Sequence, residues 1–184
     1  AMAEFRMGNP GRLTTDIGPV IDSEAKANIE RHIQTMRSKG RQVFQAVREN
    51  SEDAREWQSG TFVAPTLIEL DDFAELQKEV FGPVLHVVRY NRNQLPELIE
   101  QINASGYGLT LGVHTRIDET IAQVTGSAQV GNLYVNRNMV GAVVGVQPFG
   151  GEGLSGTGPK AGGPLYLYRL LANRPESALA VTLA

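Results

Sequence analysis

A glycine-dense stretch runs from Gly141 to Gly158 and continues at Gly162–Pro164. Glycine loses more backbone freedom on folding than any other residue, so this density predicts a loop rather than a regular helix or strand. Unlike a polar linker, the loop interleaves apolar residues with its glycines: Val143, Val144, Val146, Phe149 and Leu154. Backbone N–H groups of such a packed loop can hold an anion. The sequence therefore predicts an anion-binding loop, with a purely structural loop as the alternative.

Within this stretch, residues 151–156 read Gly-Glu-Gly-Leu-Ser-Gly and match the dinucleotide-binding pattern G-x-G-x-x-G. That pattern binds a dinucleotide only where a strand directly precedes it and a helix opens on it. Here Gln147–Gly150 precedes the match, and Thr157–Pro159 follows it. We therefore interpret the match as coincidental.

The chain has no cysteine, which excludes a thiol nucleophile, a disulfide and a thiolate metal site within it. Its three histidines, His32, His86 and His114, are far apart in the sequence and lack the spacing of metal ligands. We expect them to be surface or edge residues rather than a zinc site.

Composition bounds the class of protein. With 184 residues, 41% of them hydrophobic, the chain can form one domain, or slightly more, around a core. A net charge of −3 favours neither nucleic acid nor an anionic membrane surface as a partner. The chain has no apolar run near the roughly 20 residues of a membrane helix, and Ala1–Arg6 does not resemble a signal peptide. These features predict a cytoplasmic protein.

The first half of the chain predicts one helix and two extended segments. Asp22 and Ser23 cap a helix that ends at Gly40. A strand is expected over residues 41–47, with Val43 and Phe44 in the core. A second extended segment covers residues 62–70, where Pro65 argues for an edge position or a bulge.

The second half predicts a strand at residues 84–90, a helix capped by Asn93, a strand at 109–115, a helix capped by Asp118 and a strand at 131–136. Two such crossovers imply an α/β fold with a parallel sheet. Ligands of these sheets bind beyond the carboxyl ends of the strands. The glycine loop follows the last strand at that edge, which favours the binding interpretation.

Four segments, in this order and spacing, resemble the aldehyde dehydrogenase superfamily: Glu79–Val84, Val135–Asn136, Pro148–Gly151 and Ser155–Gly158. The insert Gly141–Gly145 and the tail Gly158–Pro164 narrow the resemblance to glutamate-semialdehyde (pyrroline-5-carboxylate) dehydrogenases. Along its whole length the chain is most similar to the module of that type in bacterial bifunctional enzymes of proline breakdown.

The resemblance implies oxidation of an aldehyde with NAD as cofactor. It assigns Glu79 to the nicotinamide ribose and Phe81 to the nicotinamide end of NAD. It also implies that Gly141 and Ala142 hold the α-carboxylate of a small-molecule substrate through their backbone N–H groups, and that Phe149 packs on the aliphatic part of that substrate.

In this family the nucleophilic cysteine, the base and the oxyanion donor all precede the region that this chain resembles. We therefore assign no catalytic residue and expect the isolated fragment to be inactive.

Residues 1–173 are predicted to be a partial catalytic domain of the aldehyde dehydrogenase fold, and residues 174–184 a C-terminal oligomerisation strand. The expected partners are the rest of a parent enzyme and further copies of it in a homo-oligomer. The parent's other domain would carry FAD. The alternative is a non-catalytic α/β module that binds carboxylates or self-associates.

Overall fold

The computed structural model describes residues 2–46, 60–141 and 150–156. It divides into two compact units, Ala1–Asn91 and Arg92–Ala184, and each is described by itself. Within the described ranges, none of the helices has the length and hydropathy needed to cross a membrane. The predicted strand at 174–184 and the predicted residues Ala142 and Phe149 lie outside these ranges.

The first unit begins with a short 3₁₀ helix, η1 (Met2–Glu4), followed by α1 (Ser23–Ser38). The Asp22 carboxylate accepts the N–H of Ala25 at 2.7 Å and caps the amino end of α1. At the other end, Gly40 has a φ of 77° and donates its N–H to the carbonyl of Arg37, while Arg41 donates to the carbonyl of Met36. This pair of bonds is a Schellman motif. The predicted start and end of the helix are confirmed.

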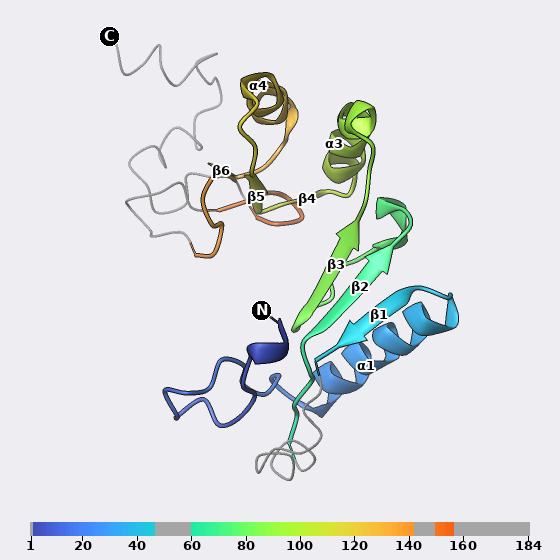
Figure 1. Ribbon diagram of the computed structural model, residues 1–184, viewed down its shortest axis with the longest axis vertical. Helices are drawn as coiled ribbons and strands as arrows, with labels where there is room; N and C mark the ends of the chain where they lie inside the picture. Colours follow the sequence, from blue (N-terminus) through green and yellow to red (C-terminus); the bar gives the residue numbers. More distant parts are fainter. Residues whose placement is uncertain (1, 47–59, 142–149, 157–184) are drawn as a thin grey trace. The chain divides into compact units, whose positions relative to one another are not determined.

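A three-stranded sheet follows, with strand order β1 (Gln42–Gln45), β2 (Thr66–Leu70) and β3 (Val84–Val88). Strand β1 is antiparallel to β2, and β3 is parallel to it (Figure 1). Helix α1 packs on one face of the sheet, where Ile29, Ile33 and Met36 meet Ile68 and Leu70 in the core. Side chains of a strand alternate between faces, so the buried residues of β2 are every second one.

Two expectations for this sheet are wrong. Pro65 does not mark an edge or a bulge, because it immediately precedes β2, which is the central strand. A proline just before a strand needs no ladder N–H. Phe44 is not in the core either: Val43 faces α1, so alternation turns Phe44 to the opposite face, where it is 55% exposed.

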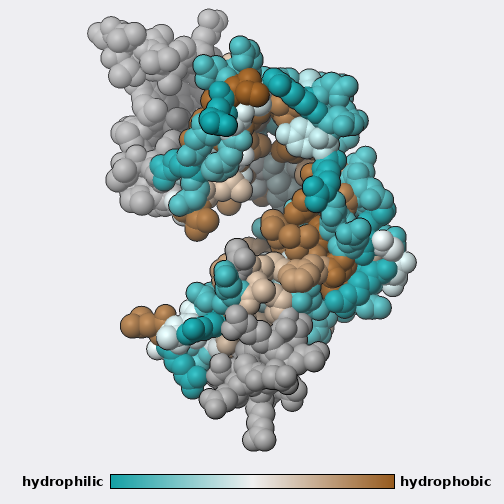
Figure 2. Space-filling view, viewed as in Figure 1, coloured by the Kyte–Doolittle hydropathy of each residue, from teal (hydrophilic) through white to brown (hydrophobic). Residues whose placement is uncertain are grey.

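The sheet face away from α1 carries an apolar row. Phe44 lies opposite Leu67, and Leu67 lies opposite Leu85 on β3. Both ends of the row are more than half exposed. Hydrophobic residues gather over β2 and β3 in the space-filling view (Figure 2). The short 3₁₀ helix η2 (Phe73–Glu75) lies in the connection between these two strands.

The second unit contains η3 (Arg92–Gln94), α3 (Leu95–Ala104), β4 (Tyr107–Gly108), β5 (Thr110–Val113), α4 (Asp118–Ser127), β6 (Asn132–Val135) and β7 (Glu152–Gly153). Strands β5 and β6 are parallel and are joined through α4, as predicted (Figure 1). Strands β4 and β7 pair antiparallel. The predicted alternation of strands and helices is therefore confirmed. Of the two predicted crossovers, only the one through α4 joins strands that pair in the described sheets, because the one through α3 leads from β3, which pairs with β2, to β5, which pairs with β6.

The sheet of β5 and β6 separates two layers. Leu111 and Val113 of β5 pack against α3 and α4, whose core residues are Leu95, Ile99 and Val124. Alternation turns Gly112 and its partner Tyr134 to the opposite face. Segments that follow β6 occupy that face, as described below.

The predicted helix caps of this unit are wrong. Helix α3 is preceded by the 3₁₀ turn η3, and its first position follows Gln94 rather than a capping Asn93. Asp118 is the first helical residue of α4, with Ile117 before it, so neither helix has a side-chain cap bond. Pro96 does occupy the first turn of α3, where its missing N–H is harmless.

Candidate functional site

Glu79 and Phe81, the predicted cofactor residues, lie between η2 and β3 in the first unit. The backbone next to them is fixed. A Cβ on Gly82 would lie 2.4 Å from Cδ1 of Ile29, so the lack of a side chain lets this segment approach α1. The carbonyl of Pro83 accepts the N–H of the first residue of β2 at 2.9 Å. Both predicted side chains are exposed, Phe81 by 85%. The segment therefore presents a carboxylate and an aromatic ring from an anchored backbone.

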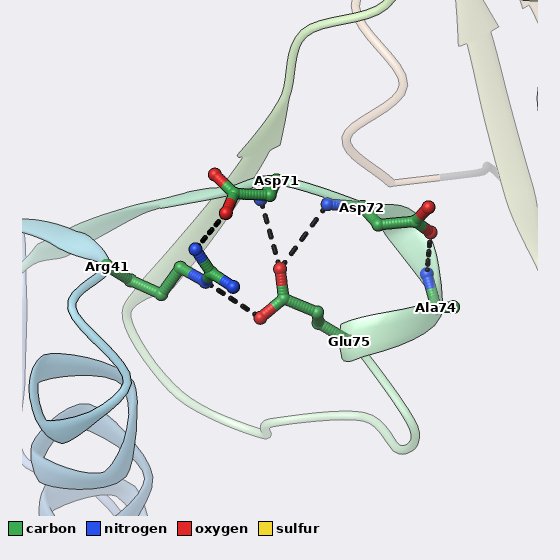
Figure 3. Close-up of polar contacts among 5 residues, drawn as sticks. All are labelled: Arg41, Asp71, Asp72, Ala74 and Glu75. Carbon is green, nitrogen blue, oxygen red and sulfur yellow. Dashed lines mark hydrogen bonds and ion pairs between the residues drawn. The ribbon is translucent and has the colours of Figure 1, made fainter.

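An ionic cluster fixes the turn from which that segment emerges. Arg41 pairs with Asp71 and donates from Nε to Oε2 of Glu75 at 2.8 Å (Figure 3). The other Glu75 oxygen accepts the backbone N–H groups of Asp71 at 3.0 Å and Asp72 at 3.3 Å. Asp72 in turn accepts the N–H of Ala74. The Arg41 hydrogen bond, helped by these backbone donors, lowers the pKa of Glu75. The turn that follows β2 is thereby tied to Arg41, which immediately precedes β1.

In the second unit, the chain leaves the carboxyl end of β6 at Asn136 and reaches Gly141 within the described residues. Gly141 has a φ of 70°, and a Cβ built on it would have nothing within 4 Å. This is the edge at which parallel sheets bind ligands. Gly141, the first predicted substrate-anchoring residue, therefore follows this edge in the chain, and it is exposed in a conformation that favours glycine.

The later part of the glycine stretch lies elsewhere. Residues 150–156 return to the amino ends of β5 and β6, where Asn132 donates its side-chain N–H to the carbonyl of Gly150 at 3.2 Å. The N–H of Leu154 donates to Gly106, and the N–H of Gly108 donates to the Ser155 hydroxyl. These groups bond to one another, so the purely structural interpretation holds for this part of the stretch.

This segment also supports the rejection of the G-x-G-x-x-G match. Glu152 and Gly153, the second and third residues of the match, form β7, which pairs antiparallel with β4. In the described part of the segment no helix opens on it. The expectation that glycine density excludes any strand is wrong here, because Glu152 and Gly153 form a two-residue strand.

A cavity of about 490 Å³ lies at the same amino-terminal edge of the second unit. It is lined by the ends of α3 and α4 and by β7, including Asn103, Tyr107, Gln129 and Glu152. Gly141, the predicted site residue of this unit that the structure describes, does not line it. The cavity therefore lies at the end of the sheet opposite to Asn136, where the path to Gly141 begins.

His86 lies on β3, an edge strand of the described sheet, as expected, but His32 and His86 are half-buried and contact each other rather than being separate surface residues. Their Nε2 atoms are 2.8 Å apart, between α1 and β3, and both rings are half-buried. The ring centroids are 5.1 Å apart. With the Nε2 atoms in contact, the centroids are farthest apart when both Nε2 atoms lie on the line that joins them. The observed separation is close to that limit, so the two nitrogens point at each other. That geometry fits a hydrogen bond in which one neutral ring donates to the other. Burial lowers the pKa of each ring, with Lys39 and Lys78 adding to the effect at His32 and His32 adding to it at His86.

We expect this pair to make folding pH-dependent. Because the folded pKa values lie below the ordinary value of 6.5, the unfolded chain binds more protons below that pH. The stability that the neutral pair contributes is complete above pH 6.5 and is lost as pH falls toward the folded values. Urea unfolding between pH 7.5 and 5 measures the slope. The double substitution H32Q/H86Q should flatten it, and H114Q should leave it unchanged. An unflattened slope in the double variant would contradict the assignment.

Comparison with known proteins identifies the class. The sequence profile of the aldehyde dehydrogenase family matches residues 1–172. The chain therefore belongs to the aldehyde dehydrogenase family. It is 98% identical over 184 residues to the bifunctional protein PutA of Escherichia coli (strain K12), covering all of this chain and 14% of that protein. A 1-pyrroline-5-carboxylate dehydrogenase of Halalkalibacterium halodurans is 40% identical over 163 residues, which are 88% of this chain and 30% of that protein.

Solved structures confirm the predicted fold. The crystal structure of a mutant of proline utilization A from Bradyrhizobium japonicum superposes with a TM-score of 0.80 at 50% identity, covering 91% of this chain and 16% of that one. A 1-pyrroline-5-carboxylate dehydrogenase from Thermus with bound NAD superposes with a TM-score of 0.69 at 37% identity, covering 84% of this chain and 28% of that one. The chain thus spans less than a third of each of these relatives.

The contacts that hold the path from Asn136 to Gly141 were not predicted from the sequence. Asn136 is the one described non-glycine residue with a positive φ, 54°. An asparagine at the end of a strand is a usable signal, since asparagine tolerates this conformation better than most residues. Gly112 in the middle of β5 is a second signal, because glycine inside a strand often marks a close approach.

Proposed function

We propose that this chain is part of an NAD-dependent L-glutamate γ-semialdehyde dehydrogenase, which oxidises the semialdehyde to L-glutamate in proline catabolism. The observation that carries the proposal is the 98% identity, over the whole chain, to a stretch of the bifunctional protein PutA. The chain has no cysteine, so the nucleophile that the family resemblance implies comes from the rest of the parent enzyme. The isolated chain is accordingly inactive.

The first unit fits a role in holding NAD. Glu79 offers a solvent-accessible carboxylate that can accept hydrogen bonds from ribose hydroxyls, and Phe81 offers an exposed ring to the nicotinamide end. The close approach of Gly82 to α1 fixes the backbone from which both side chains project. When bound, NAD supplies the hydride acceptor of the oxidation.

The second unit fits a role in holding the aldehyde. The backbone N–H groups of Gly141 and Ala142 would bind the α-carboxylate, and Phe149 would pack on the aliphatic carbons. Support comes from Gly141, whose left-handed backbone and open surroundings leave room for a ligand. Successive N–H groups in such a turn form an anion-binding concavity.

The proposal extends to the parent protein. Its other domain would be an FAD-dependent proline dehydrogenase, and residues 174–184 would pair with another copy in a homo-oligomer. We place the enzyme in the cytoplasm, bound to neither a membrane nor, through this segment, nucleic acid.

Replacing Gly141 tests the anchor. Gly141→Ala in the parent-length enzyme should lower kcat/KM for the semialdehyde about tenfold or more, because a side chain strains the left-handed turn that aims the N–H groups. The dissociation constant for NAD should stay within about twofold. Steady-state kinetics and NAD titration give the two values.

Gly40→Ala is a matched control. Gly40 also has a left-handed φ, 77°, and open space around its Cα, but it ends α1 in the other unit. The substitution Gly40→Ala should strain the backbone to a similar degree and leave kcat/KM for the aldehyde unchanged. Equal losses of aldehyde use and NAD binding in Gly141→Ala would count against the assigned anchor.

A further inference from the structure

The ladder between β5 and β6 ends in an unusual way. Val113 and Val135 are the last register pair, and the N–H of Asn136 donates to the carbonyl of Val113 at 2.9 Å. A parallel ladder that continued would next join the N–H of Thr115 to the backbone carbonyl of Asn136, and the carbonyl of Thr115 to the N–H of Asn138.

The side-chain amide of Asn136 takes both places. Its Oδ1 accepts the N–H of Thr115 at 2.9 Å, and its Nδ2 donates to the carbonyl of Thr115 at 2.9 Å. One side chain thus satisfies the donor and the acceptor that a continuing strand would have bonded. The backbone of Asn136 is released from the ladder and turns with its φ of 54°.

The residues after this turn lie back over the sheet. The guanidinium of Arg137 is 4.8 Å from the centroid of the Tyr134 ring, a cation–π contact. Met139 lies over Gly112, where a Cβ would come within 3.1 Å of the methionine sulfur. Asn138 accepts the N–H of Val140 through its side chain at 3.3 Å. The path from Asn136 to Gly141 is therefore set by contacts that depend on where the turn begins.

We propose that Asn136 is a positioning residue for substrate binding: its amide replaces one peptide group of the ladder and so aims the loop that presents Gly141 to the substrate carboxylate. This inference rests on the proposed function, because it takes Gly141 as part of the aldehyde anchor. Asn136 does not touch substrate or cofactor in this role. It acts through the direction of the loop.

The test is a set of substitutions in the parent-length enzyme, with KM for the semialdehyde, kcat and KM for NAD as readouts. Asn136→Ala should raise KM for the semialdehyde about tenfold, since two hydrogen bonds are lost and alanine disfavours a positive φ. Asn136→Gly, which keeps the φ accessible, should raise it nearly as much. Asn136→Asp retains the acceptor for the N–H of Thr115 but not the donor to its carbonyl. Its KM for the semialdehyde should lie between the values of the unsubstituted enzyme and of Asn136→Ala. KM for NAD should not change.

Asn103→Ala is the matched control. Asn103 also makes two hydrogen bonds to backbone, to the carbonyl of Ser127 at 2.8 Å and from the N–H of Gln129 at 2.9 Å, but it joins the ends of α3 and α4. It should lower the melting temperature about as much as Asn136→Ala and leave KM for the semialdehyde unchanged. If Asn136→Ala and Asn103→Ala lower the melting temperature equally and both leave KM for the semialdehyde unchanged, the positioning role of Asn136 is overturned.

The Gly141→Ala enzyme separates this inference from the proposed function. If Gly141→Ala leaves KM for the semialdehyde unchanged, the anchor assignment itself fails. If Gly141→Ala raises that KM and Asn136→Gly does not, only the role of Asn136 is overturned.

Discussion

Gly131→Ala destabilises the chain by about 3 kcal/mol or more. A Cβ on Gly131 would lie 2.0 Å from the carbonyl oxygen of Gly150 and 2.8 Å from the Cα of Gly151. Both contacts are with backbone, so no side-chain rotation can relieve them. The segment 150–156 would have to leave the amino ends of β5 and β6, breaking the bond from Asn132 to Gly150. Urea unfolding monitored by far-ultraviolet circular dichroism measures the change in the free energy of unfolding.

The same substitution at Gly126 has the opposite sign. Gly126 lies inside α4, and an added Cβ would have nothing within 4 Å. Alanine is the better helix former and reduces the entropy of the unfolded chain, so Gly126→Ala should stabilise by about 0.5–1 kcal/mol. Equal effects at the two glycines would show that backbone crowding at Gly131 is not what fixes the loop.

Ile68→Ala removes about 2–5 kcal/mol from the free energy of unfolding of the first unit. Ile68 is 0% exposed, lies on the central strand of the sheet and belongs to the core formed with Ile29 and Ile33 of α1. Truncation removes buried methylene groups and leaves a cavity that the neighbouring helix and strands cannot fully close. Urea unfolding gives the loss.

Ile21→Ala is the control for that loss, since Ile21 is 92% exposed just before α1. The same chemical change there should alter the free energy of unfolding by no more than about 0.5 kcal/mol. A similar loss at both isoleucines would mean that the sheet and α1 do not share the core described above.

Features encoded within a few residues were predictable. The limits of α1 follow from Asp22 and Gly40, because a cap is made by neighbours in the chain. Parallel pairing of β5 and β6 was predicted from the strand, helix and strand order, since a crossover joins parallel strands, whereas the same order from β3 through α3 to β5 does not pair those two strands in the described sheets. The predictions from neighbouring residues were wrong at Asn93 and Asp118. A 3₁₀ turn precedes α3 where Asn93 was expected to cap it, and Asp118 is the first, uncapped residue of α4.

The candidate site was predictable only in part. The position of Gly141 beyond the carboxyl end of β6 followed from the order of elements. The separation of the glycine stretch into an exposed Gly141 and a bonded segment at residues 150–156 did not, because composition is similar in both. The roles of Glu79, Phe81, Gly141, Ala142 and Phe149 remain predictions from the family resemblance.

The sequence by itself therefore determined the limits of α1, the alternation of helices and strands, the family and the absence of a thiol. The tertiary structure decided which face receives Phe44, that His32 meets His86, and that the Asn136 amide takes the place of a peptide group. The physical reason is range: caps and alternation depend on neighbouring residues, whereas these contacts join residues 21 to 54 positions apart or depend on which face the core covers.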